Sequence, residues 1–305
     1  MGKRIFYACQ AVGIGNPTGT SYTALHGVQT VGINTTFNLE QIFEIGMISI
    51  YENVENIPDV EITLEKVLDG NPLIYTLATQ EITGGFTAKT TARCSVALSI
   101  FDDTNGAATG TPTNTCSITG AVVSQFSYKI AVDGNATETV SLVANNKTWS
   151  STLWQPNFPN SSGIESPANP SGITRRQHFN LAASTLPSDI PSSSKYQSIS
   201  VSATIARENI LELGKKAPYF RYAKFPIEIT SEFEIIAQNG DLINVVEDQN
   251  NLQNRSIILS FINGPTINLG SKNKLKSANY QGGGTDGGNA TIAYTYQTFN
   301  DFTLT

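Results

Sequence analysis

The chain has 305 residues with a net charge of −6 at pH 7, and only 14% of its residues are charged. This acidic balance argues against an ordinary nucleic-acid-binding protein, which needs a basic surface to neutralise phosphates. There is no uninterrupted apolar run of roughly 18 residues, so the sequence predicts no membrane-spanning helix. Low charge with abundant Gly, Ser, Thr and Asn is typical of a turn-rich β protein whose surface is largely covered by other protein.

A repeat begins early in the chain. Residues 39–46 read Leu-Glu-Gln-Ile-Phe-Glu-Ile-Gly, and residues 207–214 read Arg-Glu-Asn-Ile-Leu-Glu-Leu-Gly, which aligns without a gap. A tyrosine follows five residues after each glycine, at Tyr51 and Tyr219. The apolar spacing within residues 39–46 fits one face of a helix, so we expect one or two helical turns there.

The repeat continues into a strand in each copy. After one residue is dropped, residues 60–63 align with 227–230, and each copy runs on to a turn at Asp69-Gly70 or Asn239-Gly240. Apolar and polar residues alternate over 60–68, which predicts a half-buried strand.

Further strands follow in both copies. Residues 93–100 and 255–262 alternate as equivalent strands, and Gly-Asn-Ala-Thr occurs at 134–137 and again at 288–291. Each of these motifs opens a strand of period two, over 138–143 in the first copy and 292–296 in the second. Four anchors in the same order indicate an internal duplication.

Three long strands carry few charges, and they lie at residues 95–100, 124–132 and 257–262. An unpaired, uncharged sheet edge is a template for pairing with another chain. We therefore expect edge pairing between subunits at these strands; the alternative is that they are central strands.

The segment between the copies, residues 155–197, is rich in proline and serine, which predicts a long extended arm. The sequence thus predicts an all-β fold with short helices, made of two tandem β-barrel or sandwich domains from internal duplication. The expected domains are 1–154 and 198–305, with 155–197 as the connecting arm.

Equivalent loops of the two copies have opposite charge. Residues 47–61 contain four acids and no Lys or Arg, whereas residues 215–228 contain four bases and one acid. Complementary charge steers partners and fixes their register, so we expect the first loop of one subunit to meet the second loop of a neighbour, head to tail. The alternative is two solvated loops that happen to differ. The interface candidates are Tyr51, Glu52, Glu55, Asp59, Lys215, Lys216, Tyr219, Arg221 and Lys224.

Residues for catalysis or metal binding do not form a recognisable set. The only histidines, His26 and His178, are not in a metal or triad spacing. We expect no enzyme and no cofactor. Three cysteines, without Cys-x-x-Cys spacing, predict free buried thiols; a disulfide or a subunit cross-link is the alternative.

Residues 27–33, 38–46 and 50–60, together with the ending 288–302, resemble tube-type structural proteins of long-tailed bacteriophages. The resemblance covers about a third of the chain. It implies small β-barrel or sandwich domains that join side by side into a six-domain ring, with rings stacked into a hollow tail tube through which DNA passes during ejection. It also implies a location in the virion tail after synthesis in the host cytoplasm, with sheath or other tail proteins as partners.

This chain is about twice as long as a one-domain tube subunit. Either six copies build each ring and one domain decorates the wall, or three copies supply six domains, as in the hub proteins that cap such tubes. A hub or baseplate ring protein of the same fold, and a carbohydrate-binding β-sandwich adhesin, are the alternative functions.

Overall fold

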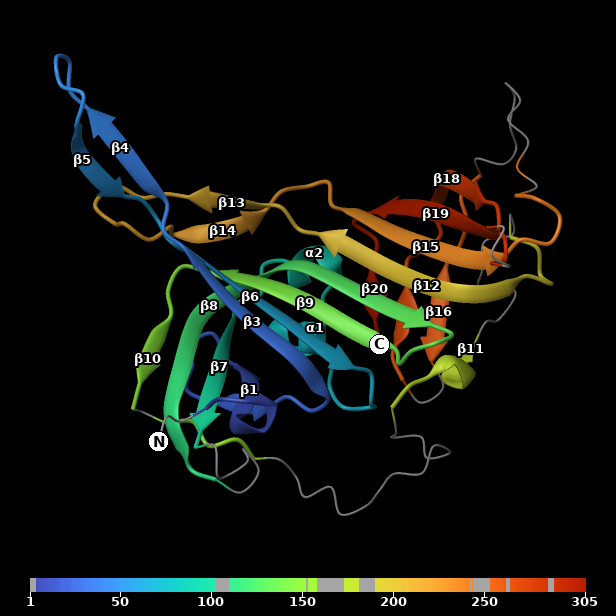
Figure 1. Cartoon of the computed structure of the whole chain (residues 1–305), viewed down its shortest axis with the longest axis horizontal. Helices are drawn as coiled ribbons and strands as arrows, with labels where there is room; N and C mark the ends of the chain where they lie inside the picture. The colour runs from blue at the N-terminus through green and yellow to red at the C-terminus, as the bar shows by residue number, and fades with distance from the viewer. Residues whose placement is uncertain are drawn as a thin grey trace.

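The structure is a computed structural model that describes residues 4–102, 110–151, 153–157, 173–180, 190–241, 243, 253–261, 264–284 and 288–305. The fold is all-β with short helices, as predicted, and its sheets form sandwiches rather than a closed barrel (Figure 1). No helix in this part of the chain is long and apolar enough to cross a membrane.

A continuous antiparallel sheet runs through both halves of the chain. Eight strands of the largest sheet, which has 12 strands in all, pair in the order β3-β6-β9-β8-β12-β15-β19-β18. Their bounds are Val28–Thr36 for β3, Asp59–Val67 for β6, Thr137–Ala144 for β9, Pro112–Ala131 for β8, Lys195–Thr204 for β12, Glu228–Ile236 for β15, Thr291–Phe299 for β19 and Lys274–Gln281 for β18.

Two further groups of strands lie against one face of this long sheet. The first half of β8 turns away from it to pair with β7 (Cys94–Phe101) and β10 (Thr148–Ser150), and β7 leads on to β1 (Gln10–Gly15) and β2 (Tyr22–Ala24). In the second half, a separate sheet contains β11 (Phe179–Asn180), β16 (Ile258–Phe261), β17 (Thr266–Asn268) and β20 (Thr303–Leu304). The helices are η1 (Tyr7–Cys9), α1 (Ile74–Ala78), α2 (Phe86–Lys89) and η2 (Arg176–His178).

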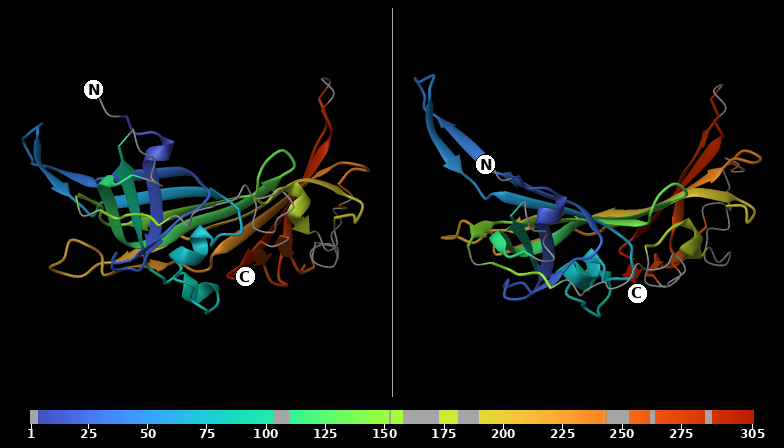
Figure 2. Two further views of the ribbon diagram at one scale, coloured as in Figure 1. Left: turned by 90° about the horizontal axis from the view of Figure 1, so that it is seen from below. Right: turned by 60° about the horizontal axis from the view of Figure 1, so that its bottom comes forward.

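Two hairpins project from the long sheet as arms. The first arm consists of β4 (Leu39–Phe43) and β5 (Ile50–Glu55), between β3 and β6. The second arm consists of β13 (Arg207–Ile210) and β14 (Phe220–Ala223), between β12 and β15. Figure 2 shows the first arm and the β18–β19 edge rising on the same side of the molecule, opposite to α1 and α2.

Strand pairing repeats between the halves, element for element. The run β3-β6-β9-β8 corresponds to β12-β15-β19-β18, and each run forms a four-stranded unit. Each unit also has a β-bulge at the same place, between Val123 and Gln125 on β8 and between Leu275 and Ser277 on β18. We call these runs the first and second units; the two are joined by the pairing of β8 with β12.

The repeat alignment needs two corrections. Leu64 lies opposite Val140, and Phe233 lies opposite Tyr294. These equivalent pairs align Val60 with Ile229 rather than with Ile227. A shift of two residues keeps the same faces, so the sequence pattern did not reveal it.

The second correction concerns β7 and its equivalent. Cys94 forms a strand pair with Ala121, and Arg255 forms the equivalent strand pair with Asn273. Arg255 therefore corresponds to Cys94 rather than to Arg93. The sequence alignment was wrong by one residue, because it matched the arginines and not the buried faces.

The helix predicted over residues 39–46 is wrong, since β4 pairs with β5 along its whole length. Every residue of β4 is exposed, so no core is present to receive a helical apolar stripe.

The three strands predicted to be sheet edges are interior strands: β7 pairs with β1 and β8, β8 with β9 and β12, and β16 with β11 and β17. The central-strand alternative is correct.

The hydrophobic core extends across both units. Phe302, near the C-terminal end, lies 4.6 Å from Phe126 of β8 between ring centroids and 5.5 Å from Tyr75 of α1. All three side chains are fully buried. Burial of each such ring stabilises the fold by about 2 kcal/mol, so the second unit contributes directly to the stability of the first.

A buried carboxylate fixes α1 against the long sheet. Glu138 of β9 accepts hydrogen bonds from the backbone N–H groups of Ile74 (2.7 Å) and Tyr75 (3.0 Å), the first two residues of α1, and from the hydroxyl of Tyr128 (2.8 Å). Burial raises the pKa of Glu138, although these hydrogen bonds and Lys66 act in the opposite direction. The carboxylate therefore satisfies helix N–H groups that would otherwise be buried without partners.

The three cysteines, Cys9, Cys94 and Cys116, are free and buried, as predicted. Burial raises the pKa of the Cys94 thiol to about 12, so this thiol is not a reactive thiolate at neutral pH. Much of the predicted arm over 155–197 lies outside the described residues. Its last part begins β12 at Lys195, three residues before the expected domain start at 198.

Candidate assembly surface

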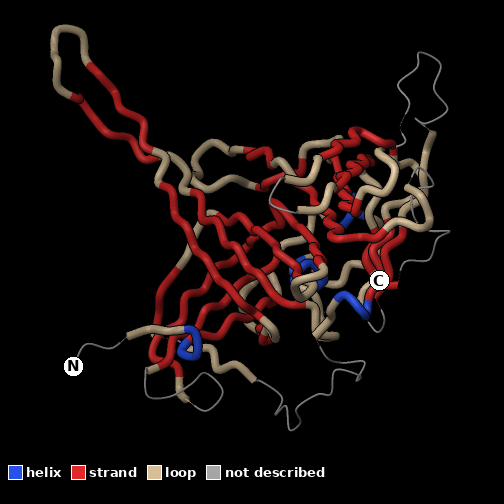
Figure 3. Tube along the Cα trace, turned by 45° about the vertical axis from the view of Figure 1, so that its right-hand side comes forward, coloured by secondary structure: helices blue, strands red, loops and turns tan. Residues whose placement is uncertain are grey.

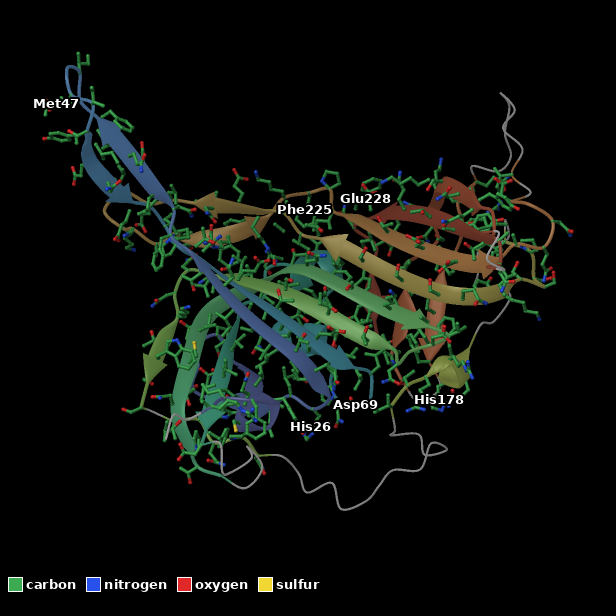
Figure 4. All side chains as sticks on the ribbon, viewed as in Figure 1. His26, Met47, Asp69, His178, Phe225 and Glu228 are labelled. Atoms are coloured by element: carbon green, nitrogen blue, oxygen red, sulfur yellow. The ribbon has the colours of Figure 1, made fainter. Side chains whose placement is uncertain are left out.

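The first arm is an exposed apolar hairpin. Figure 3 shows it extending well beyond the rest of the chain, and Met47 marks its tip in Figure 4. At the tip, Ile45 and Ile48 are 103% and 101% exposed, so they contact nothing else in the chain. The large apolar side chains exposed along the arm and its base are Phe37, Leu39, Ile42, Phe43, Ile45, Met47, Ile48, Ile50 and Tyr51. A large number of exposed apolar side chains on one hairpin indicates an interaction site.

The second arm, in contrast, is docked on the first unit of its own chain. The Arg207 guanidinium, at the base of the arm, donates to the backbone carbonyls of Val123 (3.1 Å) and Thr90 (2.7 Å). Burial lowers the pKa of Arg207 to about 10, so this side chain remains charged at neutral pH. The Arg93 guanidinium, directly before β7, lies 4.1 Å from the ring centroid of Phe220 in a cation–π contact.

The two oppositely charged loops make two contacts within the chain. Arg221 Nη2 lies 2.6 Å from Asp59 Oδ1, and Arg221 Nε donates to Asn145 Oδ1 at 2.7 Å. Lys216 Nζ lies 3.2 Å from Glu55 Oε2. The complementary charges therefore bring the second arm to the base of the first arm in the same subunit, which sequence reasoning had assigned to a neighbour.

Other predicted interface residues lie at the surface of the two arms. Lys215 pairs with Glu212 at 3.0 Å at the tip of the second arm. Tyr219 is 64% exposed, and its backbone carbonyl accepts a hydrogen bond from Arg93. Tyr51, Glu52 and Lys224 are exposed. The structure thus brings all nine candidates onto the two arms and the strands that follow them.

The two ends of the long sheet are open edges. Within the described residues, β3 pairs only with β6, and β18 pairs only with β19. One side of each strand therefore presents backbone N–H and C=O groups without strand partners. Sequence reasoning missed both edges, because strand order depends on pairings between distant parts of the chain.

One face of the long sheet is open and polar, with an excess of acids near the middle of its strands. The opposite face carries buried apolar residues, in the alternation expected for a one-sided sheet. Ser, Thr and Gln residues dominate the open face. Its charged residues near the middle of the strands are Glu61, Glu65, Lys129, Glu232 and Glu234.

Neither histidine takes part in this surface. His26 follows β2 and His178 ends η2, and the two lie at separate places in Figure 4. Among the residues that the structure describes, no group of three or more His, Cys, Asp or Glu side chains is placed to hold a metal ion.

Comparisons with known proteins found little similarity. No family model and no curated protein matches the sequence. Among solved structures, a chain of the anti-feeding prophage (AFP) baseplate, from a 6-fold symmetrised cryo-EM structure, is similar with a TM-score of 0.37 and 13% identity. The match covers 49% of this chain and 97% of that chain. A TM-score at this level does not establish a shared fold.

Proposed function

We propose that the protein is a structural subunit of a phage-type tail and that it assembles with copies of itself into a ring. The observation that carries this proposal is the long sheet, in which two equivalent units already follow one another side by side. The chain contains one such joint, and its long sheet has an open edge at each end. Further copies can therefore repeat the joint. The resemblance of residues 27–33, 38–46, 50–60 and 288–302 to tail-tube proteins supports the same role.

Three copies per ring fit the structure better than six. The resemblance implies six domains in a ring, and both units of this chain lie in the same sheet. A second unit that only decorated the outer wall would not continue the sheet of the first. Three copies would therefore supply the six units, the arrangement expected of a hub or adaptor ring as well as of a tube.

The acidic open face suits the lining of a channel for DNA. Four carboxylates and one lysine occupy the middle of this face. Negative charge repels phosphate, so DNA would slide past without binding. We therefore assign the open face to the lumen and the buried face, with α1 and α2, to the outer wall.

The first arm would contact another copy. Its counterpart, the second arm, lies across the first unit of its own chain through Arg207 and Arg221. The equivalent target of the first arm is the second unit of the neighbouring subunit. This contact would cover the apolar side chains that the isolated chain leaves exposed.

Negative-stain electron microscopy of the purified protein tests this function. We expect closed rings, with stacked rings or tubes at high protein concentration. An averaged end-on view would give the number of copies per ring, and side views would separate a tube from a single hub ring. A protein that stays monomeric at all concentrations would contradict the proposal, and specific glycan binding by the monomer would favour the adhesin alternative.

A further inference from the structure

We infer that β18 of one subunit pairs with β3 of the next in a defined register, Asn279 opposite Asn34 and Tyr280 opposite Ile33. This inference rests on the proposed self-assembly and specifies its joint. Within the chain, the joint is the pairing of β8 with β12. Because β18 is the equivalent of β8 and β3 is the equivalent of β12, the same joint is available between two chains.

The register follows from the strand pairings of the two units. On β8, Lys129 lies opposite Thr137, and on β18, Gln281 lies opposite Thr291. These two threonines end the repeated Gly-Asn-Ala-Thr motif, and the bulges on β8 and β18 also coincide. Tyr280 therefore corresponds to Tyr128.

On the other side of the joint, β3 ends at Thr36, three residues before the first arm begins at Leu39. Likewise, β12 ends at Thr204, three residues before Arg207. Thr36 thus corresponds to Thr204, and Ile33 to Val201. Since Val201 lies opposite Tyr128 within the chain, Ile33 would lie opposite Tyr280 between chains.

The side chains at the open edges match this joint. Tyr128 and Val201 are 2% and 1% exposed at the internal joint, whereas Tyr280 at the chain end is 52% exposed. The same residue type thus occupies the same place in both units, and only the one without a neighbouring strand is exposed. Pairing with β3 of a second copy would bury the Tyr280 ring against Ile33.

The paired segments also lack the features that prevent edge pairing. Residues 32–36 of β3 and 277–281 of β18 contain no charge and no proline. Exposed edges that must remain unpaired usually carry lysine, proline or an inward-pointing charge. On β18 the lysines, Lys274 and Lys276, precede the segment that would pair.

Cysteine cross-linking of the full-length protein tests the register. Two double variants place cysteines at adjacent predicted pairs, Asn34→Cys with Asn279→Cys and Thr35→Cys with Ala278→Cys. Adjacent pairs of an antiparallel ladder alternate in type, so one of the two is the close pair suited to a disulfide. The control, Thr36→Cys with Gln281→Cys, is four residues out of register, about 13 Å along the strands.

After mild oxidation, we expect a ladder of covalent oligomers on a non-reducing gel from at least one of the two test variants. The control variant and the wild type, whose native cysteines are buried, should give monomers. Rings that form normally but cross-link no better than the control would overturn this joint and leave the proposed assembly intact. Protein that does not assemble under any condition would contradict both.

A second variant provides an independent readout. Tyr280→Lys places a charge where the joint would bury a ring, while the free subunit leaves this side chain half exposed. We expect a loss of rings, with an unchanged melting temperature when the two proteins are compared as monomers at low concentration. Tyr280→Phe should assemble as the wild type does. Normal rings from Tyr280→Lys would overturn the joint.

Discussion

The docked arm depends on individual arginines. Arg221 is 8% exposed, and it holds Asp59 and Asn145 at the point where the second arm meets the first unit. A partly buried arginine that bonds a carboxylate and an amide contributes more than a surface ion pair does. The charges that distinguish the two loops in the sequence thus serve the fold of the subunit itself.

Arg221→Ala is therefore expected to lower the free energy of unfolding by about 2 kcal/mol, because it removes two charge-assisted hydrogen bonds. Urea denaturation followed by circular dichroism measures this change. The matched control is Lys215→Ala, which removes an exposed ion pair on the same arm and should cost less than about 0.5 kcal/mol. Equal effects from the two variants would mean that Arg221 does not hold the arm.

Glu138 predicts a pH dependence of stability. Burial raises its pKa in the folded state, so the folded chain binds this proton more readily than the unfolded chain. The contribution of Glu138 to stability is then fully present below its ordinary pKa and declines as the pH rises through the raised value. Glu138→Gln removes the titration, and it also lowers stability because an amide cannot accept all three hydrogen bonds.

The measurement is urea unfolding of both proteins from about pH 4 to pH 7. The difference in unfolding free energy between wild type and Glu138→Gln should shrink as the pH rises. A difference that does not change with pH would show that Glu138 does not titrate in this range.

At the scale of the elements, the two arms have the same origin and different environments. Ile45 and Leu213 occupy equivalent positions at the two tips, and both are fully exposed, at 103% and 101%. The arms differ at their bases, where Arg207 and Arg221 of the second arm correspond to Leu39 and Asn53 of the first. One arm is therefore fastened within the chain, and we propose that the other contacts a neighbour.

Replacing Ile45 and Ile48 together by serine should leave the unfolding free energy within about 0.5 kcal/mol of the wild type, since neither side chain is buried in the subunit. Assembly should weaken, with fewer or shorter particles by electron microscopy, because the contact loses two apolar anchors. Leu213→Ser is the control on the docked arm. Undiminished assembly of the double variant would exclude the first-arm tip as a contact.

The sequence predicted where the strands lie better than it predicted which strands pair with each other. Alternation correctly identified β6, β7, β9 and β19, and the repeated motifs identified the duplication. The helix predicted at residues 39–46 failed because apolar residues on an exposed arm mimic a buried stripe. The two edge strands, β3 and β18, could not be predicted. Each is an edge because it pairs on one side only, with β6 or with β19, and the other partners of β6 and β19 lie far along the chain.

For the candidate site, the sequence singled out charged residues of the two arms, and their role at a subunit interface stays a prediction. Glu55, Asp59, Lys216 and Arg221 do form opposite-charge pairs, as their signs indicated, but within one chain. Charge patterns specify which groups attract each other, whereas the path of the chain decides whether the partner is internal. The apolar surface of the first arm was overlooked because exposure cannot be read from residue type.

At the scale of the whole molecule, the open face of the long sheet makes a prediction about DNA. Assembled wild-type protein should not retain linear double-stranded DNA even at low salt, where phosphate contacts are strongest. Converting Glu61, Glu65, Glu232 and Glu234 to lysine should produce DNA binding that weakens steeply as salt is added. Gel-shift assays of rings at several salt concentrations measure both. The same conversion at Glu40, Glu44, Glu52 and Glu55 on the first arm is a control of equal charge.

Strong DNA retention by the arm variant but not by the open-face variant would place the channel elsewhere. Binding by neither variant would show that DNA does not reach either surface. The carboxylates of the open face would then serve another purpose, such as solubility of the free subunit.

The two units belong to one polypeptide, so β8 can pair with β12 before any subunit meets another. A closed ring made from such chains always has an even number of units, because each chain adds two. Half of its seams form during folding of the polypeptide, independent of protein concentration, and only the other half need a bimolecular encounter. Rings of the wrong size can therefore differ from the correct ring only in steps of two units. The seam within the chain and the seam between chains can each change in sequence without altering the other.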